Sequence, residues 1–114
     1  RVMIMDIQVP SRANANELIT LKLTLQTELR ECMVVKAYLR SNTTMDGSFN
    51  HVFTSCLCED YPRNLFWNFK PKSSMIITAV VDVIRELNIC PNDKAVIPIN
   101  ANRFYTSTSL LTYK

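Results

Sequence analysis

The sequence of 114 residues predicts an all-β fold, an antiparallel β-sandwich of about seven or eight strands. Apolar and polar residues alternate along several segments, and turn residues separate these segments. One longer segment fits a helix as well as a strand, but it is rich in β-branched residues, which favour a sheet. At this length we expect one domain over residues 1–114, with a single hydrophobic core.

The composition is that of a globular domain, with 47% hydrophobic and 20% charged residues. The net charge of +3 is small and the basic residues are scattered, which argues against a nucleic-acid partner. No uninterrupted apolar run approaches the length of a membrane span. A single glycine excludes glycine-rich nucleotide loops, so the sequence predicts no cofactor.

The first half of the chain predicts three strands. Residues 2–9 form the first strand, which Pro10 ends, and a polar loop follows over Ser11–Glu17. Residues 19–26 alternate strictly between apolar and polar side chains, as in a half-buried strand. The valine-rich segment Cys32–Arg40 is the third.

A hairpin is predicted next, between Cys32–Arg40 and Phe49–Cys58. Asp46-Gly47 supplies the turn signal at its long tip. The same loop contains Asn42-Thr43-Thr44, which fits the N-glycosylation sequon. Asn42 is therefore the candidate glycosylation site.

The second half of the chain predicts three or four more strands. After a turn at residues 59–63, an aromatic strand covers residues 65–69. The segment Ser74–Leu87 is ambiguous, but seven of its fourteen residues are β-branched, and we interpret it as a long strand. Residues 90–93 form a turn, Ala95–Ile99 a short strand carrying Pro98, and residues 104–113 the last strand.

The four cysteines predict two disulfides. Cys56 and Cys58 lie two apart, so in a strand they share a face and are poor partners for each other. We expect them to join one central strand to two other segments, with Cys32 and Cys90 as partners in either of the two remaining pairings. A metal site is disfavoured because the chain has no Cys-x-x-Cys pair and only one histidine, His51. Two disulfides predict an oxidising compartment.

No recognisable catalytic motif is present. His51 lacks the flanking residues of a catalytic triad, and no aspartate lies in an Asp-Thr-Gly or Asp-Ser-Gly loop. Asp46-Gly47-Ser48 has the residue types in the wrong order, and a hairpin turn explains it better. We therefore interpret the chain as a protein-binding module, not an enzyme. Its edge strands, near Pro98 or at the last strand, are places where a partner can add a strand.

Long blocks of the sequence resemble the prolactin-inducible protein family, also called the gross cystic disease fluid protein family. The blocks cover nearly the whole chain and are Gln26-Thr27-Glu28-Leu29-Arg30-Glu31-Cys32-Met33-Val34-Val35-Lys36, Cys56-Leu57-Cys58-Glu59-Asp60, Val80-Val81-Asp82-Val83-Ile84-Arg85-Glu86-Leu87-Asn88-Ile89-Cys90-Pro91, Ala95-Val96-Ile97-Pro98-Ile99 and Asn102-Arg103-Phe104-Tyr105-Thr106.

The resemblance implies an immunoglobulin-like β-sandwich and the disulfide pairs Cys32–Cys58 and Cys56–Cys90. It also implies secretion into exocrine fluids and an immunomodulatory binding role there. The partners it implies are the Fc region of immunoglobulin G, the helper-T-cell coreceptor, zinc-alpha-2-glycoprotein, actin, fibronectin and oral bacteria. It leaves the oligomeric state open.

Two positions depart from the family pattern. The family's glycosylation sequon falls at Lys72-Ser73-Ser74, where no asparagine is present, and Asn42 supplies a sequon in a different loop. The family is also credited with an aspartyl-type endopeptidase activity on fibronectin, which is the alternative function for this chain. The aspartate proposed as catalytic corresponds to Glu17, whose side chain is one methylene longer. The proposed catalytic geometry is therefore not preserved.

Overall fold

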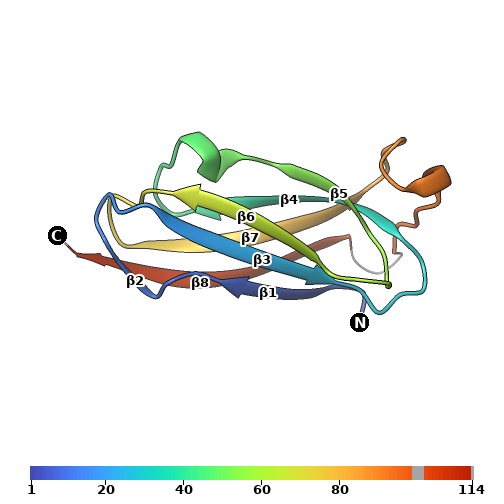
Figure 1. The fold of residues 1–114 in the computed structure, drawn as a ribbon, viewed down its shortest axis with the longest axis horizontal. Helices are drawn as coiled ribbons and strands as arrows, with labels where there is room; N and C mark the ends of the chain where they lie inside the picture. Colours follow the sequence, from blue (N-terminus) through green and yellow to red (C-terminus); the bar gives the residue numbers. More distant parts are fainter. Residues whose placement is uncertain (99–101, 114) are drawn as a thin grey trace.

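Two β-sheets pack face to face in the computed structural model, which describes residues 1–98 and 102–113 (Figure 1). The strands are β1 Ile4–Gln8, β2 Arg12–Asn14, β3 Ile19–Gln26, β4 Met33–Ser41, β5 Phe53–Leu57, β6 Arg63–Phe69, β7 Met75–Ile84 and β8 Arg103–Tyr113. One sheet has the order β1-β3-β6, and the other has the order β2-β8-β7-β4-β5. The predicted all-β sandwich is confirmed, with eight strands in the described residues.

Among the described strands, every pairing except one is antiparallel. β2 pairs with β8 in parallel, and Ala13 lies opposite Thr112. The prediction of a loop over Ser11–Glu17 was therefore wrong at its centre. Ala13 is buried beneath this short pairing, but three residues are too few to show a periodic pattern.

The alternating segment is the strand β3, as predicted. Its apolar residues Leu21, Leu23 and Leu25 are fully buried. Across the sheet, Leu21 lies opposite Trp67 and Leu23 opposite Leu65, both on β6. The aromatic segment is thus a core strand, which places its single tryptophan between the two sheets.

The ambiguous segment is also a strand, β7, as predicted. Its residues Met75, Ile77, Ala79, Val81 and Val83 all belong to the main core. The residues between them point to the outer face of the five-stranded sheet. β7 is central in that sheet, between β4 and β8.

The predicted hairpin is confirmed, since β4 pairs antiparallel with β5. Its second strand begins later than predicted, at Phe53, because a short 3₁₀ helix, η1 Gly47–Asn50, occupies the tip. Gly47 has a φ of 67°, a conformation that favours glycine. Phe49 is buried from this helix, with its ring 5.0 Å from that of Phe69.

The predicted strand over Ala95–Ile99 was wrong for residues 95–98, which are irregular, and Ile99 lies outside the described residues. The nitrogen of Val96 donates a hydrogen bond to the carbonyl oxygen of Cys32, at 2.9 Å. Pro98 cannot donate, so it cannot extend this contact into a ladder. The predicted turn before this segment contains a second 3₁₀ helix, η2 Pro91–Asp93.

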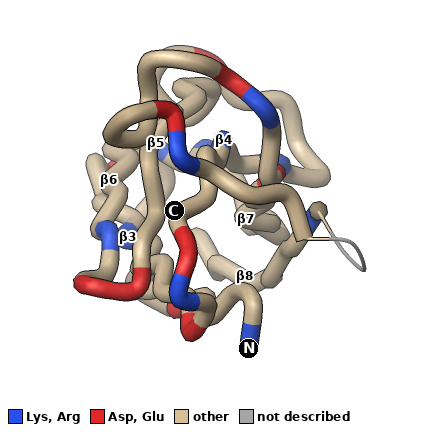
Figure 2. Tube along the Cα trace, turned by 90° about the vertical axis from the view of Figure 1, so that its right-hand side faces the viewer, with Lys and Arg blue, Asp and Glu red and all other residues tan. Residues whose placement is uncertain are grey.

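The two layers and the charges are seen end-on in Figure 2. β3 and β6 lie on one side, and β4, β7 and β8 lie on the other. Basic and acidic positions are interspersed around the trace. None of the helical segments within residues 1–98 and 102–113 has the length and hydrophobicity of a membrane span.

Candidate functional site

The outer face of the five-stranded sheet differs from that of the three-stranded sheet. On the three-stranded sheet, polar side chains pair across strands, as in the hydrogen bonds of Thr20 with Asn68 and Thr24 with Asn64. On the five-stranded sheet, apolar and aromatic side chains are interleaved with a few charges. This face holds the disulfides at one end of β4 and a groove toward the other end, and it is the candidate site.

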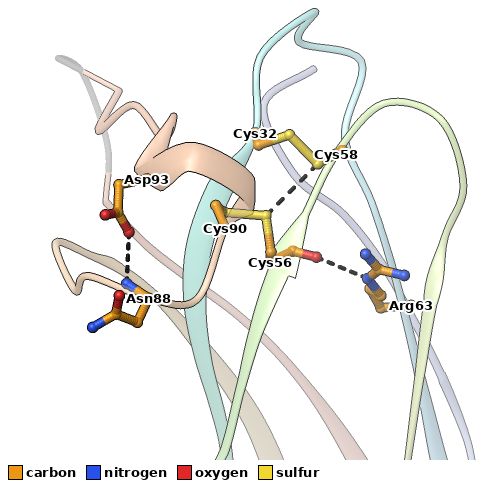
Figure 3. Close-up of a disulfide and its surroundings, with 7 residues drawn as sticks. All are labelled: Cys32, Cys56, Cys58, Arg63, Asn88, Cys90 and Asp93. Atoms are coloured by element: carbon orange, nitrogen blue, oxygen red, sulfur yellow. Dashed lines mark hydrogen bonds between the residues drawn. A yellow bond between two sulfur atoms is a disulfide. The ribbon is translucent and has the colours of Figure 1, made fainter.

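The disulfides join Cys32 to Cys58 and Cys56 to Cys90, with Cα separations of 4.2 Å and 5.0 Å (Figure 3). These are the pairs that the family resemblance implied. Cys56 lies on β5 and Cys58 directly after it. The expectation that they lie on a central strand was wrong, because β5 is the edge of its sheet.

The cysteines form a small apolar cluster of their own, separate from the main core. Cys56 and Cys90 are buried there with Val34, and Ile84 and Ile89 pack against them. The Nε of Arg63 donates a hydrogen bond to the carbonyl oxygen of Cys56, at 2.8 Å (Figure 3). The cluster therefore fixes the edge strand and the η2 segment to the sheet.

A metal role for these sulfur atoms conflicts with their bonding. In the described part of the chain, Cys32, Cys56 and Cys58 are the one group of three or more His, Cys, Asp or Glu residues with ligand atoms close enough to share an ion, within 4.8 Å. All three sulfur atoms are in disulfides. Metal ligation needs the thiolate, which a disulfide does not provide.

Glu17 is held by its own turn. Its Oε1 accepts a hydrogen bond from the backbone nitrogen of Asn14, at 2.9 Å, and its nitrogen donates to the carbonyl oxygen of Asn14, at 3.0 Å. Among the hydrogen bonds of the described residues, none joins Glu17 to another carboxyl group. The carboxylate has the geometry of a turn cap, and aspartyl-type catalysis needs two carboxyl groups that share a proton.

A groove of about 460 Å³ lies on the outer face over β4, β7 and β8. β7 contributes Ile76, Thr78 and Val80, while Arg40 and Asn42 lie on one side and Tyr105 on the other. Tyr105 is 72% exposed and Ile76 49% exposed. Both positions are outward-facing in the register, since Tyr105 lies opposite Val80 and Ile76 opposite Ser109.

An ion pair borders this groove. The Nε of Arg103 donates a hydrogen bond to Oδ1 of Asp82 at 2.6 Å, and the Nη2 of Arg103 donates to Oδ2 of Asp82 at 3.1 Å. The hydroxyl of Tyr38 donates to the same Oδ2, at 3.1 Å. The hydrogen bond from Arg103 lowers the pKa of Asp82, against the opposing effect of its partial burial, and Tyr38 lowers it further. The same pairing raises the pKa of Arg103.

β8 has a free edge beside this face. β2 covers only Leu111, Thr112 and Tyr113, so within residues 1–98 and 102–113 β8 has no strand neighbour on that side before Leu111. The backbone nitrogen of Leu111 donates a hydrogen bond to the carbonyl oxygen of Ser11, on the β2 side. The backbone nitrogen of Thr112 donates to the hydroxyl of Ser74, on the β7 side. Backbone groups alternate in direction along a strand, so Ser107 and Ser109 point theirs toward the free edge.

Asn42 lies directly after β4, at the end of the sheet away from the disulfides. Its Oδ1 accepts a hydrogen bond from the backbone nitrogen of Ile76, at 2.9 Å, and the residue is exposed. The sequence predicted Asn42 as a candidate but missed the groove beside it. The outward-facing apolar residues Ile76, Val80 and Ile84 were the available signal, because they gave the β7 segment its helix-like spacing.

Comparisons of sequence identify relatives over most of the chain. The family model described as seminal vesicle autoantigen (SVA) matches residues 1–93. The prolactin-inducible protein homolog of Oryctolagus cuniculus is 58% identical over 105 residues, which are 92% of this chain and 72% of the relative. The homolog of Bos taurus is 56% identical over 110 residues, which are 96% of this chain and 75% of the relative.

The fold has a close counterpart among solved structures. A chain in the crystal structure of the complex between zinc 2-glycoprotein and prolactin-inducible protein from human seminal plasma superposes with a TM-score of 0.94. It is 47% identical, and the match covers 98% of this chain and 94% of that one. The resemblance read from the sequence is thus confirmed, and the chain belongs to the seminal vesicle autoantigen and prolactin-inducible protein family.

Proposed function

We propose that this chain is a secreted, single-domain binding protein of exocrine fluids and that zinc-alpha-2-glycoprotein is its partner. The observation that carries the proposal is the TM-score of 0.94 to a chain in the complex of that glycoprotein with prolactin-inducible protein. Two disulfides support secretion, because such bonds persist in oxidising compartments. The turn-cap geometry of Glu17 supports a binding role over the endopeptidase alternative.

The free edge of β8 is the proposed contact. An unpaired edge offers backbone donors and acceptors to a strand of another protein. Ser107 and Ser109 are exposed and direct these groups away from β7. The other sequence-level candidate, near Pro98, lies in a segment that is irregular over residues 95–98.

Binding of the soluble chain to immobilised zinc-alpha-2-glycoprotein tests the partner, and two substitutions at one position test the contact. Ser107→Pro removes the free backbone donor and leaves the pairing of β8 with β7 intact. Ser107→Ala keeps that donor and is the control, because both variants lose the hydroxyl contact with Thr78. We expect Ser107→Ala to bind like the wild type and Ser107→Pro to bind at least tenfold more weakly, about 1.4 kcal/mol.

Failure of the wild type to bind would contradict the partner. Equal binding by Ser107→Pro, with an unchanged thermal unfolding midpoint, would contradict the edge contact alone.

Further proposed partners rest on the family resemblance, as does the immunomodulatory role. They are the immunoglobulin G Fc region, the helper-T-cell coreceptor, actin, fibronectin and oral bacteria. The same measurement with each of them tests these proposals. We also propose that Asn42 carries an N-linked glycan.

A further inference from the structure

The sequon asparagine and the outer-face groove adjoin one another. Asn42 lines the groove together with Ile76 and Tyr105. The volume of about 460 Å³ is within the range of small-molecule sites. Between Ile76 and Val80 the groove follows β7 for about 14 Å, at a rise of about 3.4 Å per residue. It is therefore an elongated depression that begins beside a glycosylation sequon.

Asn42 is held in one orientation. Its Oδ1 accepts the hydrogen bond from Ile76, and this bond fixes the plane of the side-chain amide. Within residues 1–98 and 102–113, the Nδ2 atom, which carries the glycan in N-glycosylation, makes no hydrogen bond. Asn42 and Thr44, the first and last sequon residues, are both exposed.

We propose that the N-linked glycan of Asn42 lies along this groove, with its first N-acetylglucosamine rings packed on Ile76 and Tyr105. This inference rests on the proposed glycosylation of Asn42. A sugar ring has apolar C–H faces and a polar rim. The exposed aromatic ring and aliphatic chain match those faces, and the guanidinium of Arg40, which lines the groove, suits the hydroxyl groups.

The glycan has a consequence for partner binding. Over the groove, it shields the exposed side chains of Ile76 and Tyr105, which without a cover would favour non-specific association. The free edge of β8 at Ser107 and Ser109 points its backbone groups sideways, in the plane of the sheet, and stays open. A partner is thereby restricted to the edge and kept off the face.

Two substitutions at Thr44 separate the sequon from the asparagine. Thr44→Ala destroys the sequon and leaves Asn42 and its bond to Ile76 in place, while Thr44→Ser keeps the sequon and is the control. Both variants and the wild type are secreted from mammalian cells, and intact mass gives the glycan occupancy. Hydroxyl-radical labelling then measures the accessibility of Tyr105, with Tyr61 and Tyr113 as internal references.

We expect glycan on the wild type and Thr44→Ser and none on Thr44→Ala. Tyr105 labelling should rise several-fold in Thr44→Ala, and also in wild type treated with peptide N-glycosidase, while Tyr61 and Tyr113 stay unchanged. Absence of glycan from the wild type would overturn both the glycosylation of Asn42 and this inference. If the wild type is fully glycosylated and its Tyr105 is labelled as strongly as in Thr44→Ala and in the enzyme-treated wild type, only the position of the glycan along the groove would be overturned. Neither result decides whether the chain binds zinc-alpha-2-glycoprotein, which the assay with the immobilised glycoprotein tests separately.

Discussion

The sulfur atoms of Cys56 and Cys58 lie 3.7 Å apart, yet they are not bonded to each other. Cys56 forms its disulfide with Cys90, and Cys58 forms its disulfide with Cys32. The two bonds differ in exposure. Cys56 and Cys90 are buried in the outer cluster, whereas Cys32 and Cys58 are half-buried. Two neighbouring disulfides therefore present unequal access to a reductant.

The first prediction concerns their order of reduction. Limited treatment with a phosphine reductant at pH 3 should open Cys32–Cys58 before Cys56–Cys90, because access controls the rate. Acid keeps the freed thiols protonated, so they do not exchange with the adjacent bond. Alkylation and peptide mapping read the order. Earlier labelling of Cys56 and Cys90 would show that burial does not protect that bond.

The second prediction concerns Asp82 and Arg103. Folding lowers the pKa of Asp82, so their pairing stabilises the folded state above the unfolded-state pKa. That contribution is lost as pH falls through the lower folded-state pKa. Arg103→Gln should lower the free energy of unfolding at neutral pH, and the difference from wild type should shrink below about pH 4.

Carboxyl NMR titration and urea unfolding at several pH values check this prediction. Lys22→Gln is the control, because Lys22 lies opposite Phe66 in the three-stranded sheet, whereas Asp82 lies in the five-stranded sheet. The Asp82 titration should move toward the ordinary aspartate range in Arg103→Gln and stay in place in Lys22→Gln. If the midpoint of the Asp82 titration is unchanged in Arg103→Gln, the guanidinium of Arg103 is not the cause of the lowered pKa of Asp82.

The third prediction uses adjacent residues on opposite faces of β6. Trp67 is 1% exposed, packs edge-on against Phe53 and donates to the carbonyl oxygen of His51, whereas Phe66 is 52% exposed. Trp67→Ala should lower the free energy of unfolding by about 3–5 kcal/mol. Phe66→Ala should change it by about 0.5 kcal/mol or less. Far-ultraviolet circular dichroism in urea measures both, and similar losses would contradict the assignment of faces.

The sequence predicted the strands β3 and β7, but with unequal clarity. The alternation in β3 identified its strand and its buried face, because one side meets the core and the other meets water. In β7, Ile76, Val80 and Ile84 face outward, so both faces of the strand carry apolar residues. Their spacing of four residues is the spacing expected on one face of a helix. Their β-branched character still favoured the strand.

The remaining features depend on contacts distant in sequence. β2 exists because Ala13 meets Thr112, and nothing in a three-residue segment predicts that pairing. The edge position of β5 follows from sheet order, which cysteine spacing does not encode. Asn42 was recognisable as a sequon, but its groove depends on Tyr105, which a different strand brings beside it.

The fourth prediction separates the turn role of Glu17 from a catalytic one. Glu17→Ala removes the acceptor for the nitrogen of Asn14 and should lower stability by about 1 kcal/mol, as for a lost cap. Glu17→Gln keeps an acceptor oxygen and should be milder. Any fibronectin cleavage in the preparation should persist in both variants. Loss of pepstatin-sensitive cleavage in Glu17→Gln, with stability retained, would support the endopeptidase alternative.

The proposed binding of this chain to zinc-alpha-2-glycoprotein can be measured by sedimentation velocity of the two purified proteins. The chain is taken from mammalian secretion, so that the state of Asn42 is the natural one, and is titrated into the glycoprotein. We predict a faster-sedimenting species that contains both proteins and grows with concentration until it saturates. Two proteins that sediment independently throughout the titration would contradict the claim.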